Sequence, residues 1–224
     1  MNALEIFFNP DIAARAFPIL LRGLGMTLLL GVTAIVFGTL LGLAIALVRL
    51  FAPLPFRLLA AGYTDVMRAL PVLVVLILIY YALPFAGIVF SSFTAAAVAL
   101  SLVLGAYSAE VMRAGIQSVP HGQFEAASSL GLGFVRSMQK VVLPQAIRLV
   151  IPPQASNCVS IIKDTSLASV VAMSDLLKQA TDAQALFANP TPLMVAALIY
   201  LAILWPLVRL TGWLEHHLQR AYQR

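Results

Sequence analysis

The sequence predicts an all-α integral membrane protein with five membrane-spanning helices. Hydrophobic residues make up 61% of the chain and charged residues 10%, whereas soluble proteins carry about 25% charged residues. Uncharged stretches cover residues 23–48, 69–109 and 183–208. Each exceeds the roughly 20 residues that cross the hydrocarbon layer as a helix, and the second is long enough for two spans.

The five spans are expected at residues 19–48, 58–83, 92–116, 148–171 and 191–213. The first is a retained span, because residues 1–17 lack the cationic start of a secretory signal and the apolar run exceeds a signal core. A cluster of Pro84, Gly87 and Ser91-Ser92 favours a turn between the second and third spans. Lys163 and Asp164 interrupt the fourth, which must therefore be a span with polar contents.

The cations indicate the orientation. By the positive-inside rule they mark the cytoplasmic side, so the N-terminus is expected outside and the C-terminus inside. The formal charge of +5 is dispersed along the chain, which argues against a nucleic-acid-binding patch. The outer side keeps Arg15, Arg22 and Lys178, balanced by Glu5, Asp11, Asp175 and Asp182. The inner side holds Arg49, Arg57, Arg113, Arg136, Lys140, Arg148, Arg209, Arg220 and Arg224.

The chain divides into an N-terminal outer segment (1–18), a transmembrane domain (19–214) and a cytoplasmic tail (215–224). Gly38 and Gly42, and a repeat of small residues at Ser101, Gly105 and Ala109, favour close helix packing, within one bundle or at a dimer face. Asp175 is expected to cap a short outer helix. The single Cys158 has no partner within the chain for a disulfide.

A cytoplasmic loop spans residues 117–147. Residues 123–130 favour helix, Gly131 and Gly133 permit a sharp bend, and residues 134–142 resume an amphipathic helical spacing. Pro144 is expected to end or kink this helix. The pattern fits a docking element, and equally an interfacial helix that lies on the headgroups.

The spacing of this loop resembles a known family. EAASSLGLGFVRSMQKVVLP (125–144) is similar to the cytoplasmic "EAA" loop of permease subunits of ATP-binding cassette (ABC) importers, with valine at 141 where isoleucine is usual. Residues 105–131 (GAYSAEVMRAGIQSVPHGQFEAASSLG), 63–76 (YTDVMRALPVLVVL) and 161–171 (IIKDTSLASVV) resemble the polar amino acid uptake subfamily, which includes histidine and glutamine permeases. There the second motif usually reads R-G-T-P, where this chain has R-A-L-P.

The resemblance implies a five-helix bundle of the type I importer kind in the bacterial inner membrane. A protein of this kind would translocate an amino acid by alternating access. The loop would insert into a cleft on an ATPase subunit through Glu125, Ala126, Ala127, Gly131, Leu143 and Pro144. It also implies an extracytoplasmic amino-acid-binding protein and a second permease copy or paralogue.

The chain itself has no G-x-x-x-x-G-K-[ST] phosphate loop, so no cofactor is expected on it. ATP and Mg²⁺ would sit on a separate ABC ATPase dimer. The chain is therefore expected to be a transport subunit and not an enzyme. No Ser/His or paired-aspartate constellation indicates an intramembrane enzyme, and no histidine spacing indicates a metal site.

A polar stripe follows the fourth span, where Ser156, Asn157, Ser160, Lys163 and Asp164 share about a third of the helix circumference. Charged residues at this depth are costly and indicate a functional site, or else they neutralise groups on neighbouring helices. Asp164 could also cap a restarting half-helix. The expected solute-binding residues are Arg68, Asn157, Ser160, Lys163 and Asp164.

A cation suits a solute carboxylate, while amide and hydroxyl groups can orient the rest. In relatives that carry cationic amino acids, the position of Asn157 can be acidic, so its neutrality favours a neutral, amide or acidic amino acid. The alternative function is an autonomous ion-coupled carrier or channel that uses Lys163 and Asp164. Glu110 and Arg113 are expected to form a structural ion pair rather than a gate.

Overall fold

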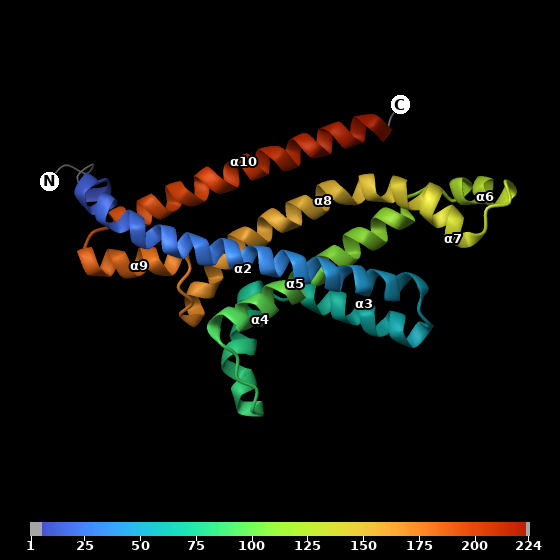
Figure 1. Cartoon of the computed structure of the whole chain (residues 1–224). Coiled ribbons are helices and arrows are strands. Elements are labelled where there is room, and N and C mark those ends of the chain that lie inside the picture. The colour runs from blue at the N-terminus through green and yellow to red at the C-terminus, as the bar shows by residue number, and fades with distance from the viewer. Residues whose placement is uncertain (1–5, 223–224) are drawn as a thin grey trace. The chain divides into compact units, whose positions relative to one another are not determined.

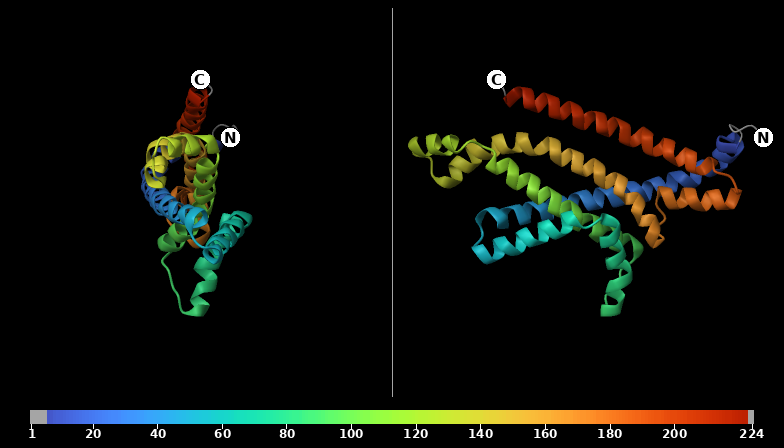
Figure 2. Two further views of the ribbon diagram at one scale, coloured as in Figure 1. Left: turned by 90° about the vertical axis from the view of Figure 1, so that its right-hand side faces the viewer. Right: turned by 180° about the vertical axis from the view of Figure 1, so that it is seen from behind.

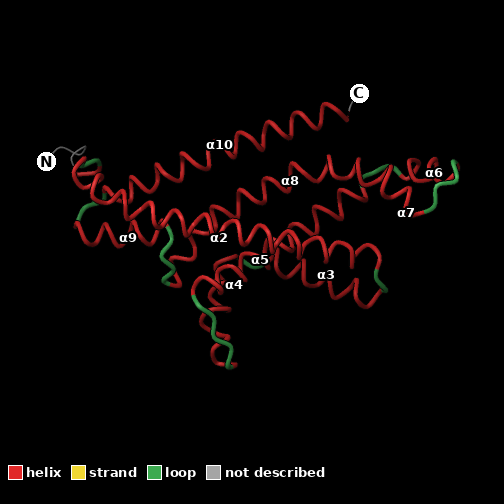
Figure 3. Tube along the Cα trace, viewed as in Figure 1, coloured by secondary structure: helices red, strands yellow, loops and turns green. Residues whose placement is uncertain are grey.

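The structure, a computed structural model, describes residues 6–222, and every regular element in that range is a helix (Figures 1 and 3). The expectations that concern Glu5 and Arg224 lie outside the described residues. In chain order the elements are α2 (Pro10–Phe51), α3 (Leu54–Ala69), α4 (Val72–Ile77), the π-helix η1 (Leu78–Ala82), the 3₁₀-helix η2 (Leu83–Ala86), α5 (Ser92–Gln117), α6 (His121–Ser129), α7 (Phe134–Ser137), the π-helix η3 (Met138–Val142), α8 (Leu143–Asp164), the 3₁₀-helix η4 (Thr165–Val171), α9 (Leu176–Phe187) and α10 (Thr191–Tyr222).

Three described helices are long and apolar enough to cross a membrane: α2, α5 and residues 191–218 of α10. The segments Leu54–Ala69 and Val72–Ala86 pass the same test only as a pair that is bent at the break between them, as in a broken span or a re-entrant loop. The expected span at 58–83 is therefore wrong as a single continuous helix. The helix stops before Pro71, because proline restricts the residue that precedes it.

Two π-helices precede prolines, and both reflect a missing amide donor. The Leu83 N–H donates to the Leu78 carbonyl just before Pro84, and the Leu143 N–H donates to the Met138 carbonyl just before Pro144. Proline cannot donate to the carbonyl four residues earlier, so the preceding turn widens. Of the two alternatives expected at Pro144, an end of the helix is wrong, because the chain continues directly into α8, whereas the widened turn before Pro144 is a local distortion of the helix.

The chain divides into two compact units. The first comprises Met1–Val36, Leu70–Ser101 and Val159–Leu207, and the second comprises Phe37–Ala69, Leu102–Cys158 and Val208–Arg224. Four helices, α2, α5, α8 and α10, contribute residues to both units.

In the first unit, α9 packs against α2 and α10. Its buried residues Leu176, Ala180 and Ala183 share an apolar cluster with Leu20 of α2 and Ala196 of α10. A side chain at Gly23 of α2 would meet the Asp175 carbonyl oxygen at 2.8 Å. The buried Asp175 carboxylate accepts from the Leu177 and Lys178 N–H groups at 3.3 and 2.9 Å, so the expected capped helix is confirmed.

In the second unit, the small residues bring α2 and α5 together. A Cβ atom at Gly38 would lie 2.8 Å from the Leu104 Cβ, and one at Gly42 would collide with Ser108. The Tyr63 hydroxyl of α3 donates to the Leu102 carbonyl at 2.6 Å. The glycine pair therefore serves packing within one chain, which is the first of the two expected roles.

Candidate functional site

The loop between α5 and α8 turns a sharp corner at Gly131, as the sequence predicts. Gly131 has φ +77°, and its N–H donates to the Ser128 carbonyl at 2.9 Å, while the Leu132 N–H donates to the Ala127 carbonyl at 3.1 Å. These two hydrogen bonds form a Schellman motif, which closes α6 with a left-handed residue. Glycine is favoured at 131 because side chains disfavour a positive φ.

The underside of this corner is packed. Ala127 is 3% exposed, and the fully buried Ser137 hydroxyl donates to the Leu132 carbonyl at 3.1 Å. Val119, Val142 and Ala146 form a small buried cluster beneath it. The two short helices are thus held as one folded hairpin beyond the ends of α5 and α8, which Figure 2 shows from two sides.

The upper face of the corner is exposed. Glu125 lies there with 74% of its side chain accessible, 3.6 Å from the His121 Nδ1 atom. Leu130 is 83% exposed and Val135 is 63% exposed. A shallow pocket of about 300 Å³ opens beside Phe124 and Phe134, whose rings pack edge to face. The hairpin therefore presents one acid among uncovered apolar side chains, as a docking surface does.

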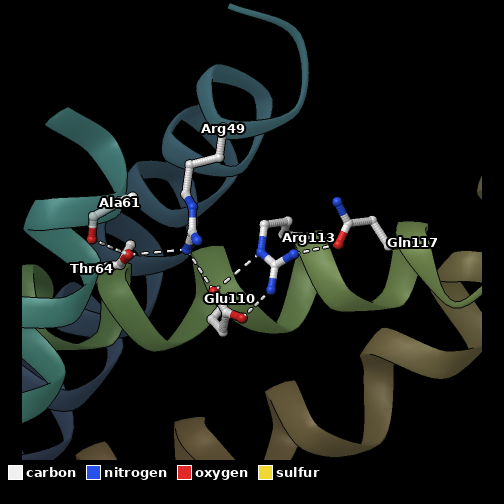
Figure 4. Close-up of polar contacts among 6 residues, drawn as sticks. All are labelled: Arg49, Ala61, Thr64, Glu110, Arg113 and Gln117. Atoms are coloured by element: carbon white, nitrogen blue, oxygen red, sulfur yellow. Dashed lines mark hydrogen bonds and ion pairs between the residues drawn. The ribbon is translucent and has the colours of Figure 1, made fainter. Parts of the chain in front are cut away.

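The expected ion pair of Glu110 with Arg113 is confirmed, and the structure adds a third member (Figure 4). Arg49 of α2 donates to the Glu110 Oε2 atom at 2.6 Å and to the Thr64 hydroxyl at 3.0 Å. Thr64 in turn donates to the Ala61 carbonyl. One carboxylate thus joins α2 and α5, and Arg49 extends the link to α3. Sequence reasoning placed Arg49 on the inner side of the membrane but did not pair it with Glu110, because the two residues lie 61 positions apart.

The polar stripe lies along α8 as expected. Ser160 and Lys163 are exposed, and Asp164 is partly buried. Asp164 stands where α8 changes to the 3₁₀-helix η4, but its side chain makes no capping hydrogen bond. The expectation that Asp164 caps a half-helix is therefore wrong: helical geometry continues into η4 without that side chain.

Arg68 and Asn157 belong to the second unit, whereas Ser160, Lys163 and Asp164 belong to the first. The Arg68 guanidinium lies 5.8 Å from the centre of the Tyr107 ring, in a cation–π contact. Asn157 has a buried amide nitrogen without a hydrogen-bond acceptor among the described residues. It is the only one of the expected solute-binding residues in the described chain with such an orphaned group.

Gln154, one turn before Cys158, forms a polar junction that sequence reasoning did not single out. Its amide nitrogen donates to the Ser108 hydroxyl at 2.9 Å and to the Thr39 hydroxyl at 3.2 Å. This junction links α8 to α5 and α2 inside the second unit.

Comparisons with known proteins identify the family. Residues 34–220 match the family described as "Binding-protein-dependent transport system inner membrane component". The chain belongs to this family. Its architecture is therefore that of a membrane transport component, and the all-helical fold described above is the fold of the type I importer permeases.

Two curated relatives and one solved structure are similar over most of the chain. The probable amino-acid ABC transporter permease YckA of Bacillus subtilis is 40% identical over 200 residues, which cover 89% of this chain and 88% of the relative. The L-cystine transport system permease TcyB of the same organism is 35% identical, covering 96% and 91%. An amino acid ABC transporter crystallised with histidines matches with a TM-score of 0.85 and 36% identity, over 91% of this chain and 96% of that chain.

Proposed function

We propose that this family member is the membrane-spanning subunit of an ATP-driven importer that carries an amino acid into the cytoplasm by alternating access. The observation that carries the proposal is the α6–α7 hairpin, with its glycine corner, packed underside and exposed acid. The permeases named as amino-acid transporters, similar over nearly the whole chain, support the substrate class. The chain is the transport subunit, and a separate partner subunit hydrolyses ATP.

The partner that docks on the hairpin is an ABC ATPase dimer, which holds ATP and Mg²⁺. The contact is made by Glu125, Ala126, Ala127 and Gly131. The movement of the ATPase is then transmitted to α8 through its first residues, Leu143 and Pro144. The direct continuation of the loop through η3 into α8 supports this route, because no flexible linker intervenes. A second permease copy or a paralogue completes the path, and an extracytoplasmic binding protein delivers the solute.

Glu125→Lys tests this assignment, because it reverses the only acidic charge on the exposed hairpin face. We expect the ATPase to be lost from the purified complex while the permease still inserts in the membrane. Asp11→Lys is the matched control, since it makes the same charge change at the exposed start of α2. Recovery of an intact complex from the Glu125→Lys strain would remove the docking role.

The topology is five spans in the bacterial inner membrane, with the N-terminus outside and the C-terminus inside. Three long apolar helices support three of the spans, and the bent pair supports a fourth if its two segments form one span. The fifth is α8 with η4, whose polar stripe lowers its hydropathy. The transmembrane domain covers residues 19–214, with a tail at 215–224 and an outer segment at 1–18.

The solute is a zwitterionic amino acid of neutral, amide or acidic kind, held by Arg68, Asn157, Ser160, Lys163 and Asp164. The buried, unpartnered amide nitrogen of Asn157 supports the assignment, because such a donor is costly until an acceptor such as a carboxylate reaches it. The exposed Lys163 supplies a cation, which suits a solute carboxylate.

Lys163→Ala tests the solute site by uptake of radiolabelled amino acids. We expect uptake to fall about tenfold or more while the complex with the ATPase still forms. Lys178→Ala is the control, because Lys178 pairs with Asp182 on the outer helix α9. Unchanged uptake kinetics in Lys163→Ala would make Lys163 a structural residue.

The alternative is an autonomous ion-coupled carrier or channel that uses Lys163 and Asp164. It predicts solute transport by the purified chain in liposomes without nucleotide. Transport that strictly requires the ATPase and ATP excludes it. The family membership favours the importer.

A further inference from the structure

A second pocket is lined by none of the residues assigned to docking or to the solute. It measures about 300 Å³ and is contained within the second unit. The α10 side of the pocket carries Glu215 and Leu218. Its α8 side is lined by Arg148, Leu149, Pro152, Pro153 and Ser156. These α8 positions are spaced i, i+1, i+4, i+5 and i+8, so they share one face of the helix.

Two adjacent prolines leave backbone carbonyls on the α8 side of the pocket free to accept hydrogen bonds. α8 runs through Pro152 and Pro153 without interruption. Neither proline has an N–H group, so the carbonyls four residues earlier, on Arg148 and Leu149, lose their helical donors. Both residues line the pocket. Carbonyl groups left in this way need another donor, and a bound N–H-bearing group would supply one.

The charged groups of the pocket are of opposite sign. The Arg148 guanidinium suits a phosphate, which it can bind through two parallel hydrogen bonds. The Glu215 carboxylate and the two carbonyls suit an ammonium group, which is a donor of several N–H bonds and accepts none. The lining therefore fits a ligand that carries a phosphate next to a primary ammonium.

The neighbouring residues place the pocket at headgroup depth. On α10 the exposed Leu210 and Trp213 come just before the charged end of the helix, and the Trp213 ring stacks on His217 with centroids 5.1 Å apart. Ile151, on α8, is also exposed. Tryptophan is enriched where apolar helices meet the membrane surface. The pocket lining itself combines apolar residues, among them Leu149 and Leu218, with the charged Arg148 and Glu215.

We propose that this pocket binds the headgroup of an aminophospholipid, with its phosphate on Arg148 and its ammonium on Glu215 and the carbonyls of Arg148 and Leu149. A water-soluble phosphoethanolamine has the same headgroup chemistry, but the apolar approach favours the lipid. Phosphatidylcholine fits poorly, because its quaternary ammonium has no N–H to donate. The proposal rests on the membrane location of the chain and not on its transport activity.

The test measures lipid retained by the purified full-length chain, by native mass spectrometry from nanodiscs that contain equal phosphatidylethanolamine and phosphatidylcholine. We expect phosphatidylethanolamine to be enriched at least fivefold. Mono- and dimethylated ethanolamine lipids should be retained progressively less, as N–H donors are removed. Equal retention of the ethanolamine and choline lipids would overturn the proposal.

Three variants distinguish lipid binding at this pocket from nonspecific attraction of lipid to the charges of the protein. Pro153→Ala restores the donor to the Leu149 carbonyl at an exposed position and leaves both charges in place, so it should reduce the enrichment several-fold. Glu215→Gln should do the same. Arg57→Gln, an exposed cation on α3, should have no effect, and an equal loss in that control would overturn the proposal.

Soluble glycerophosphoethanolamine is added as a competitor at the concentration of the lipid. We expect no displacement of the lipid. Full displacement would overturn the lipid assignment in favour of a soluble ligand. Unchanged circular dichroism of each variant shows that the loss is not due to unfolding.

Discussion

Arg49 and Glu110 are joined by a hydrogen bond of 2.6 Å, although 61 residues separate them in the sequence. The Glu110 carboxylate also pairs with Arg113, and Arg49 also donates to Thr64. One carboxylate therefore bridges two guanidinium groups at the place where α2 and α5 meet (Figure 4). Because the pairs are only partly accessible, solvent screens them less than it screens surface pairs.

Glu110→Gln should destabilise the permease, since it leaves Arg49 and Arg113 close together without a counter-charge. Hydrogen bonds to charged groups contribute about 1.5–3 kcal/mol each, so we expect a loss of about 2–3 kcal/mol in detergent-unfolding experiments. The Arg49→Gln single variant and the double variant complete a cycle. Losses that simply add would show that Arg49 and Glu110 do not interact.

Gly42→Ala should destabilise the α2–α5 contact, because the new methyl group would collide with Ser108. Overpacking of this kind costs about 1–3 kcal/mol. Gly25→Ala on the same helix is the control, since nothing lies within 4 Å of a methyl group there. Alanine at 25 should leave stability equal or raise it by up to about 1 kcal/mol. Equal thermal midpoints for the two variants would contradict the packing role.

The Asp175 carboxyl should make stability pH-dependent. Burial raises its pKa to about 6, although hydrogen bonds from the Lys178 and Leu177 N–H groups act in the opposite direction. The folded pKa lies above the unfolded value of about 3.9, so the protonated group stabilises the fold. That contribution is complete below about pH 4 and is lost as the pH rises through about 6.

The measurement compares thermal midpoints of the wild type and Asp175→Asn between pH 4 and pH 8. Asparagine keeps a capping oxygen but does not titrate. Relative to this variant, the wild type should lose stability from pH 4 to pH 6 and then stay level. Asp182→Asn, at an exposed carboxylate on the same helix, should leave the pH dependence of the thermal midpoint as it is in the wild type. A pH-independent difference between wild type and Asp175→Asn would disprove the assignment.

Local patterns in the sequence were sufficient to predict several features of the fold. The cap at Asp175 and the corner at Gly131 depend on a few neighbouring residues, and both were predicted. The Gly38–Gly42 pair was recognised as a close-packing surface because its spacing is that of one helix face. The apolar runs likewise indicated α2, α5 and α10.

Features that depend on distant residues were not predictable in this way. Nothing local pairs Arg49 with Glu110, or Gln154 with Ser108, because these contacts exist only after the helices pack. The break before Pro71 had a local signal, since proline restricts Leu70, but a continuous apolar run concealed it. At Asp164 the local cap pattern predicted a hydrogen bond that the structure does not contain, because the helix continues as η4.

Gly131→Ala gives the sharpest test of the docking hairpin. Gly131 has φ +77° and Gly133 has φ −67°, and a methyl group at either position would meet nothing within 4 Å. The two positions therefore differ in backbone conformation and not in available space. Alanine in the left-handed region costs about 1–2 kcal/mol, so Gly131→Ala should open the Schellman corner.

We expect Gly131→Ala to weaken binding of the purified permease to its ATPase about tenfold, measured by equilibrium titration, while Gly133→Ala leaves it unchanged. Hydrogen exchange should rise at the Leu132 N–H, which bonds to the Ala127 carbonyl, in the first variant alone. Equal affinities for the two variants would mean that the shape of the corner does not determine docking. A loss in both would assign the effect to flexibility of residues 131–133 instead of to the left-handed glycine, because only Gly131 requires that conformation.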